Sequence, residues 1–299
     1  RQDFNRTYGA DANFTFFDFL NFSSFILKTK TPEVPNKDVA GRFGINWTDP
    51  LLSLEASYLS IQENFNPEVG FVPRAGIRKT AGTFAVRPRP GERIPSIREF
   101  EPSFNVEYIT DQENLLVTRT LEGHFLIQFH KGGVIRFGGK SNFEHLTEPF
   151  QIRNDQVIPV GDYSFDQYTL SVSTDRSRAF GGEFKTTIGS FFDGDKNSYS
   201  LTGRFQRPQL LAEVSWSRDN VSLPSGNFDT DLVATRLNYS FNPRMFLNAL
   251  IQYNSDLREI ATNIRFNWIY KPLSDVFLVY NERRDSIGEV EERALILKV

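Results

Sequence analysis

Acidic and basic residues recur at strand positions that alternate with apolar residues, and their types could support two kinds of chemistry. The acids are Glu55, Glu101, Glu107, Glu122, Glu183 and Glu213, and the bases are Arg42, Arg136, Lys185, Arg204, Arg236 and Arg265. Two carboxyl groups about 5 to 10 Å apart can hydrolyse a glycosidic bond. Equal numbers of acids and bases on one face favour mutual pairing instead. We therefore predict that these side chains line a water-filled lumen and that none is catalytic.

Other site chemistries find little support in the sequence. His124 is one of three histidines and has no second histidine at ligand spacing, which favours a polar wall residue. The segment 193–197, DGDKN, begins like a calcium loop, but Ser198 and Arg204 stand where glycine and glutamate are required. The chain has no cysteine, no glycine-rich phosphate loop and no HExxH pattern. We therefore expect no enzyme activity, no metal site and no cofactor. A net charge of −3 gives no reason to expect a nucleic-acid partner.

The elements that would position these side chains are strands, and the segment 236–281 shows them best. Four runs with two-residue alternation follow one another, separated only by turns at 242–244 and 271–275. In the run 263–270, NIRFNWIY, the residues Ile264, Phe266 and Trp268 fall on one face while polar residues fall on the other. Each turn contains a proline, which cannot donate to a strand ladder. The segment is therefore predicted to form two adjacent hairpins.

Aromatic residues stand at both ends of these runs, with mostly aliphatic residues between them. Those at the proline-turn end are Tyr239, Phe241, Trp268 and Tyr270, and those at the far end are Tyr253 and Tyr280. A bilayer favours amphipathic rings at both headgroup levels, whereas a soluble sandwich has no such requirement. We predict that these six residues lie at the lipid interface of a transmembrane barrel. A soluble all-β domain is the alternative.

Composition agrees with strands that cross a membrane. The hydrophobic share is 39% and the mean hydropathy is −0.39, as expected when only every second strand residue faces lipid. No run approaches the ~18 apolar residues of a helical span. The first residues, RQDFNRTYGADANF, contain no signal peptide. Because an outer-membrane protein of a Gram-negative bacterium needs one, we interpret the chain as a mature or partial segment.

The order of turns and connections along the whole chain predicts its topology. About seventeen runs are recognised, and long connections follow the fourth, eighth, twelfth and sixteenth, at 64–74, 142–162, 218–231 and 281–293. Short turns follow odd-numbered runs, except for the longer 87–96. Outer-membrane barrels gather long loops at one end in this way. The predicted fold is a single all-β domain over residues 1–299. It is an antiparallel up-and-down transmembrane β-barrel of about 16 to 18 strands, with short periplasmic turns and longer extracellular loops.

Four phenylalanines fall on the predicted loops, where a fully solvated crown would not need them. They are Phe65, Phe71, Phe150 and Phe228. Three interpretations are open. The side chains pack within the loops, fold into the lumen as a plug, or contact a ligand, and we favour these in that order.

Several fragments together resemble one bacterial family over residues 60–299. They are NPEVGFVPR, TDRSR, VSLPSGNF, LNYSFNPRMFLNALIQYNS and NIRFNWIYKPLSDVFLVYNE. They are similar to the C-terminal domain of an uncharacterised family whose members carry a carbohydrate-binding, family-nine-like module before a predicted outer-membrane barrel. The resemblance implies a barrel in the outer membrane of Bacteroidetes-like or related bacteria. It also implies a sugar-binding module that this sequence does not include, and it carries over no catalytic residues.

Two classes of function follow from these expectations. The first is a porin-like pore or plugged channel for a small solute, for which carbohydrate derivatives are one candidate, or an anchor for an N-terminal sugar-binding module. The second is a surface-exposed glycan-binding protein or glycan hydrolase that uses the barrel as a platform. The expected partners are outer-membrane lipid and a small solute or glycan.

Overall fold

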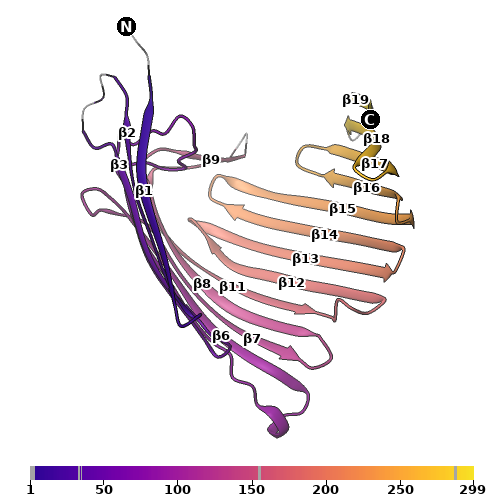
Figure 1. Cartoon of the computed structure of the whole chain (residues 1–299), viewed down its shortest axis with the longest axis horizontal. Helices are drawn as coiled ribbons and strands as arrows, with labels where there is room; N and C mark the ends of the chain where they lie inside the picture. Colours follow the sequence, from indigo (N-terminus) through magenta and orange to yellow (C-terminus); the bar gives the residue numbers. More distant parts are fainter. Residues whose placement is uncertain (1–3, 33, 35, 154–155, 286–287) are drawn as a thin grey trace. The chain divides into compact units, whose positions relative to one another are not determined.

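A computed structural model describes residues 4–32, 34, 36–153, 156–285 and 288–299. Within these residues, seventeen strands form one sheet and two short strands form a separate hairpin (Figure 1). The only helical element described is one turn of 3₁₀ helix. No helix in this part of the chain has the length and apolar character to cross a bilayer. The predicted all-β, antiparallel up-and-down architecture is confirmed, and seventeen sheet strands agree with the expected number.

Two compact units make up the chain, and each is described by itself. The first comprises Arg1–Ile127 and Gly138–Gln167, and the second comprises Gln128–Phe137 and Tyr168–Val299. The elements up to the start of the second unit's long strands are β1 (Arg6–Phe16), β2 (Leu20–Lys30), β3 (Val39–Thr48), β4 (Leu52–Ile61), β5 (Ile77–Val86), η1 (Gly91–Arg93), β6 (Ile97–Asp111), β7 (Leu116–Phe129), β8 (Val134–Leu146), β9 (Phe150–Arg153), β10 (Gln156–Ile158) and β11 (Gly161–Ser173).

The remaining strands belong to the second unit. They are β12 (Phe180–Phe191), β13 (Gly194–Arg207), β14 (Leu210–Leu223), β15 (Gly226–Asn242), β16 (Met245–Asn254), β17 (Glu259–Lys271), β18 (Ser274–Asp285) and β19 (Val290–Lys298). Each of β12 to β18 pairs antiparallel with the strand that follows it in sequence. Figure 1 shows β12 to β15 as long neighbouring strands joined by tight turns.

The strands of the first unit follow the same rule. Each of β1 to β5 pairs antiparallel with the next strand, and β8 pairs with β11. Side chains directly opposite each other share a face of the sheet, so the register carries one face across several strands. Phe43 on β3, for example, lies opposite Tyr58 on β4. The alternation of apolar and polar residues in the sequence therefore gives the sheet two chemically different faces.

Three of the four predicted long connections are shorter than expected, which corrects the sequence interpretation. β8 continues to Leu146, and the predicted connection 142–162 also contains β9 and β10. β14 and β15 meet at a two-residue turn, 224–225, inside the predicted loop 218–231. β18 and β19 likewise extend into 281–293, of which 286–287 lie outside the described residues. The segment 62–76 between β4 and β5, in contrast, contains no strand, as predicted for 64–74.

Polar side chains explain why these strand extensions were interpreted as loops. In the extensions of β14 and β15 the face that was apolar carries Arg218, Asp229 and Asp231, whereas the opposite face carries the buried Val221 and Leu223. The pattern of an apolar outer face therefore ends in the sequence before the strands do. On the polar side, Arg218 of β14 lies 2.6 Å from Asp229 and 3.5 Å from Asp231 of β15. Cross-strand pairs of opposite charge favour strand pairing there.

Candidate functional site

One face of the sheet presents large apolar side chains in both units. In the first unit Phe43 is 51% exposed, and its cross-strand neighbour Tyr58 is exposed as well. In the second unit Leu201 is 54% exposed and lies opposite the exposed Trp216. We call the face that carries these residues the apolar face, and the opposite one the charged face. No other layer of the described chain covers these side chains.

The six predicted interface aromatics all lie on the apolar face of the second unit. Tyr239 and Phe241 meet at 4.8 Å between ring centroids, next to the turn that joins β15 and β16. Trp268 and Tyr270 meet at 6.1 Å, next to the turn between β17 and β18. Of the remaining two, Tyr253 lies next to the other end of β16. Tyr280, predicted at the far end of its run, lies in the middle of β18, because this strand continues to Asp285.

The first unit has a similar aromatic group that the sequence interpretation did not single out. Phe16 and Phe22 lie 5.9 Å apart between centroids, beside the turn that joins β1 and β2. Phe19 and Trp47 lie 6.0 Å apart, close to the turn between β3 and β4. The cluster of Phe16, Phe17, Phe19 and Phe22 around the turn between the first two runs was the signal that could have identified this group.

On the charged face of the first unit, each predicted acid has a basic neighbour. The pairs are Glu55 with Arg42 (4.0 Å), Glu107 with Lys79 (2.5 Å), Glu101 with Arg87 (2.8 Å) and Glu122 with His124 (2.9 Å). Arg136 of β8 belongs to the second unit and is exposed. The contacts of Glu55, Glu101 and Glu107 with arginine or lysine are the mutual pairing expected of acids and bases that share one face.

The charged face of the second unit carries a row of three charges. Arg204, Glu213 and Arg236 lie directly opposite one another on β13, β14 and β15. Glu213 pairs with Arg236 at 3.5 Å, whereas Arg204 donates to Gln206 at 2.6 Å. The sequence therefore placed these residues on one face, and the register brings them side by side.

The other predicted residues of this face are spread along it. Glu183 lies 3.7 Å from Arg176, which belongs to the turn between β11 and β12. Lys185 stands two residues further along β12, opposite Ser200. The guanidinium of Arg265 lies 4.7 Å from the centre of the Phe277 ring, which is cation–π distance.

The segment 62–76 folds onto the charged face of the first unit. Phe65 is only 5% exposed, and it belongs to a buried apolar cluster with Ala40, Ile61, Ile77 and Ile109, all of which point to this face. Val72 of the same segment also packs against this cluster, so the favoured prediction, packing within the loop, accounts for only part of the surroundings of Phe65. Its contacts with strand residues match the second alternative, a loop folded onto the inner face.

The other three loop phenylalanines do not share this position. Phe71 lies in the same segment but is 87% exposed. Phe150 is exposed at the start of β9, and Phe228 belongs to β15, where it faces Val221 of β14. Among these four phenylalanines, Phe65 is thus the one that is buried against strand residues.

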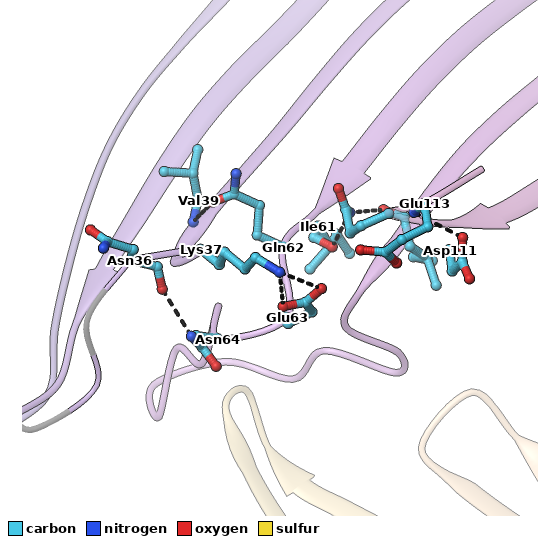
Figure 2. A network of polar contacts seen from close by, with 11 residues as sticks. Asn36, Lys37, Val39, Ile61, Gln62, Glu63, Asn64, Asp111 and Glu113 are labelled. Carbon is cyan, nitrogen blue, oxygen red and sulfur yellow. Dashed lines mark hydrogen bonds and ion pairs between the residues drawn. The ribbon is translucent and has the colours of Figure 1, made fainter. Parts of the chain in front are cut away.

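Polar contacts hold the start of the segment 62–76 in place, as Figure 2 shows. The Lys37 ammonium lies 2.7 and 3.0 Å from the two carboxylate oxygens of Glu63. The Gln62 side-chain oxygen accepts a hydrogen bond from the Val39 amide at 3.0 Å, and Asn64 donates to the Asn36 carbonyl at 2.9 Å. The hydrogen bond and the charge of Glu63 raise the pKa of Lys37 above its ordinary value.

Carboxylates also stabilise the tight turns of both units. Asp49 accepts hydrogen bonds from the Trp47 indole and from the amides of Leu52 and Leu51, and these donors lower its pKa. Asp175 accepts hydrogen bonds from the Ser177 amide and hydroxyl, which lower its pKa in the same way. Both turns therefore depend on an ionised carboxylate.

No family model matches the chain, and no curated protein matches it. Solved structures do match. The ferric enterobactin receptor PfeA of Pseudomonas aeruginosa, as a double mutant, has 8% identity and a TM-score of 0.44, covering 99% of this chain and 69% of the receptor. OmpF of Salmonella typhi with daunomycin has 10% identity and a TM-score of 0.38, covering 84% of this chain and 89% of OmpF. OmpT of Vibrio cholerae without loop L8, an outer membrane protein, has 10% identity and a TM-score of 0.39, covering 84% of this chain and 93% of OmpT. At these values, what the chain does has to follow from its own residues.

Proposed function

We propose that the chain is a bacterial outer-membrane β-barrel protein whose charged face lines a pore or a plugged channel for a small polar solute. One observation carries the proposal. Apolar side chains stand exposed at alternate positions on consecutive strands, while the opposite face holds ion pairs. This is the arrangement that a sheet needs when hydrocarbon wets one side and water the other.

The cost of leaving the apolar face in water supports this proposal. Soluble monomers rarely expose contiguous apolar patches larger than a few hundred Å². Each Å² of such surface costs about 25 cal/mol in water, and lipid removes that cost. Phe43 and Tyr58 lie opposite each other on neighbouring strands of the first unit, as do Leu201 and Trp216 in the second. Exposed apolar side chains therefore adjoin one another within each unit.

The charged face supports passage or binding of a polar solute. Acids and bases alternate along it, and such charges set the field that selects a solute in a water-filled path. The buried Phe65 and the segment 62–76 occupy part of this face in the first unit, which favours a partly obstructed path over a wide one. A carbohydrate-derived solute and an attached sugar-binding module rest on the family resemblance alone and stay predictions.

A matched pair of substitutions on β13 tests the proposal. Leu201→Arg places a charge on the apolar face, and Ser200→Arg places the same charge on the charged face. We expect Leu201→Arg to reduce the folding free energy in lipid vesicles by about 2 to 4 kcal/mol, the cost of arginine near the bilayer midplane. Ser200→Arg should insert normally and change the ion selectivity in planar bilayers.

Two results would contradict the proposal. One is wild-type protein that stays soluble and folded without detergent. The other is an equal loss of folding free energy for both variants, because two faces in the same solvent would not distinguish them. A protein that inserts but neither conducts nor binds solute would retain only the anchoring role.

A further inference from the structure

A pocket on the charged face of the second unit gathers arginines at the turn-side end of β12 to β14. The lining residues include Thr174, Arg176, Arg178, Glu183, Arg204 and Glu213. Three of these residues are positively charged and two are negatively charged. Its volume is about 120 Å³, several times the ~10 to 15 Å³ that one water needs, so a small oxyanion fits.

The carboxylates near this pocket either pair outside it or lie beyond hydrogen-bond distance of its arginines. Glu183 lies 3.7 Å from Arg176, and both residues line the pocket. Glu213 pairs with Arg236, which does not line the pocket. The carboxylate of Asp175 accepts hydrogen bonds from Ser177, and it lies 3.9 Å from Arg178, beyond hydrogen-bond distance. The guanidiniums consequently retain positive charge that no carboxylate fully neutralises.

Arg204 retains donor capacity that the chain does not use. Its Nη2 atom donates to Gln206, and no other hydrogen bond or ion pair of its guanidinium is formed within the described residues. Its Nε atom is buried, so an anion in the pocket would bind the Nη atoms instead. A charge-assisted hydrogen bond from a guanidinium to an oxyanion is stronger than one between neutral groups.

One glycine keeps the space open. Gly181 lies opposite Arg204, and a Cβ atom at this position would lie 3.2 Å from the Thr174 hydroxyl. This distance is tighter than ordinary contact. A side chain at this position would therefore crowd the pocket wall.

We infer that this pocket binds a small oxyanion, a phosphate or a carboxylate, through Arg176, Arg178 and Arg204. Arg204 would hold the anion from within the sheet, and the two arginines of the turn 174–179 would close over it from the side. All residues of the site belong to the second unit. Anion binding there can therefore be tested whether or not the protein conducts ions.

Binding of inorganic phosphate to the detergent-solubilised full chain tests this inference. The phosphorus NMR linewidth of phosphate is followed in a titration at constant ionic strength, and labelled acetate is titrated separately to distinguish the two oxyanions. We expect saturable binding of at least one anion. Arg204→Gln should weaken it about tenfold, the effect of losing one strong charge-assisted contact.

Two further variants keep the test decisive. Glu183→Gln removes a negative charge from the lining and should strengthen binding several-fold. Arg265→Gln removes an arginine of the same face that stacks on Phe277 outside the pocket, and it should leave binding unchanged. Absence of saturable binding in the wild type, or equal loss in Arg204→Gln and Arg265→Gln, would overturn the inference. Circular dichroism of each variant confirms that the fold is intact.

Discussion

The charged faces of the two units differ in what fills them. In the first unit an apolar cluster around Ile61, Ile77 and Ile109 interrupts this face, and the segment 62–76 covers it with Phe65. In the second unit the row Arg204, Glu213 and Arg236 leaves an arginine-lined pocket. The same strand architecture can thus be closed by its own chain or left open to a solute, depending on a few side chains.

The first region is held together by the burial of apolar side chains, whereas the second is held by pairs of opposite charges. An apolar cluster is stabilised by removal from water, so it recruits chain from a neighbouring connection. Exposed ion pairs contribute little to stability because water screens them. We therefore expect substitutions in the first region to affect stability and those in the second to affect binding.

Loss of the Phe65 ring should produce the larger effect. Phe65→Ala removes a buried aromatic from the cluster, and we expect the segment 62–76 to lose about 3 kcal/mol of stability. Hydrogen exchange of the amides in 62–76 measures this loss. Phe71→Ala, in the same segment but exposed, is the control and should leave exchange unchanged. Equal exchange in both variants would show that burial of Phe65 does not hold the segment.

Loss of the Glu213 carboxylate should produce a smaller change in stability. Glu213→Ala breaks the pair with Arg236, and we expect the unfolding free energy to fall by less than about 1 kcal/mol, as for other partly exposed ion pairs. Denaturant unfolding in detergent measures it. A loss above about 2 kcal/mol would mean that the second unit's charged face is as important for stability as the first unit's apolar cluster.

Alkaline pH should also loosen the segment 62–76, but less than loss of the Phe65 ring does. Glu63 raises the pKa of Lys37 above 10.5, so this pair's stabilisation is fully present below pH 10.5 and is lost as the pH rises through the raised value. Protease susceptibility of the segment measures the change. Glu63→Gln should remove this pH dependence. A wild type with the same pH dependence as Glu63→Gln would show that the ion pair does not contribute.

Acid should destabilise the turn at Asp49 in the first unit and the turn at Asp175 in the second. The pKa values of Asp49 and Asp175 are lowered from 3.8, so their stabilisation is present above pH 3.8 and is lost as the pH falls through the lowered values. NMR shifts of the Leu51 and Ser177 amides report the two titrations. Trp47→Phe removes a donor to Asp49 and should raise only its titration midpoint. A parallel shift at Asp175 would contradict this local cause.

Much of the fold was predictable because a strand records its two environments in alternate residues. The run 263–270 needed only that period to assign a face to Ile264 and Arg265. The extensions of β14 and β15 past the apolar belt were not predictable, since the outer face there carries ions such as Arg218 and Asp229 while the buried Val221 lies on the opposite face, so the apolar pattern changes sides.

The sequence by itself determined that the chain forms antiparallel strands with an apolar face and a charged face, because the two-residue period acts between near neighbours along the chain. Only the tertiary structure decided that Phe65 lies on Ile61 and Ile77, and that Arg204 opens onto a pocket with Arg176 and Arg178. These contacts join different strands and connections. They depend on strand register and on the path of a loop, and no local pattern encodes either.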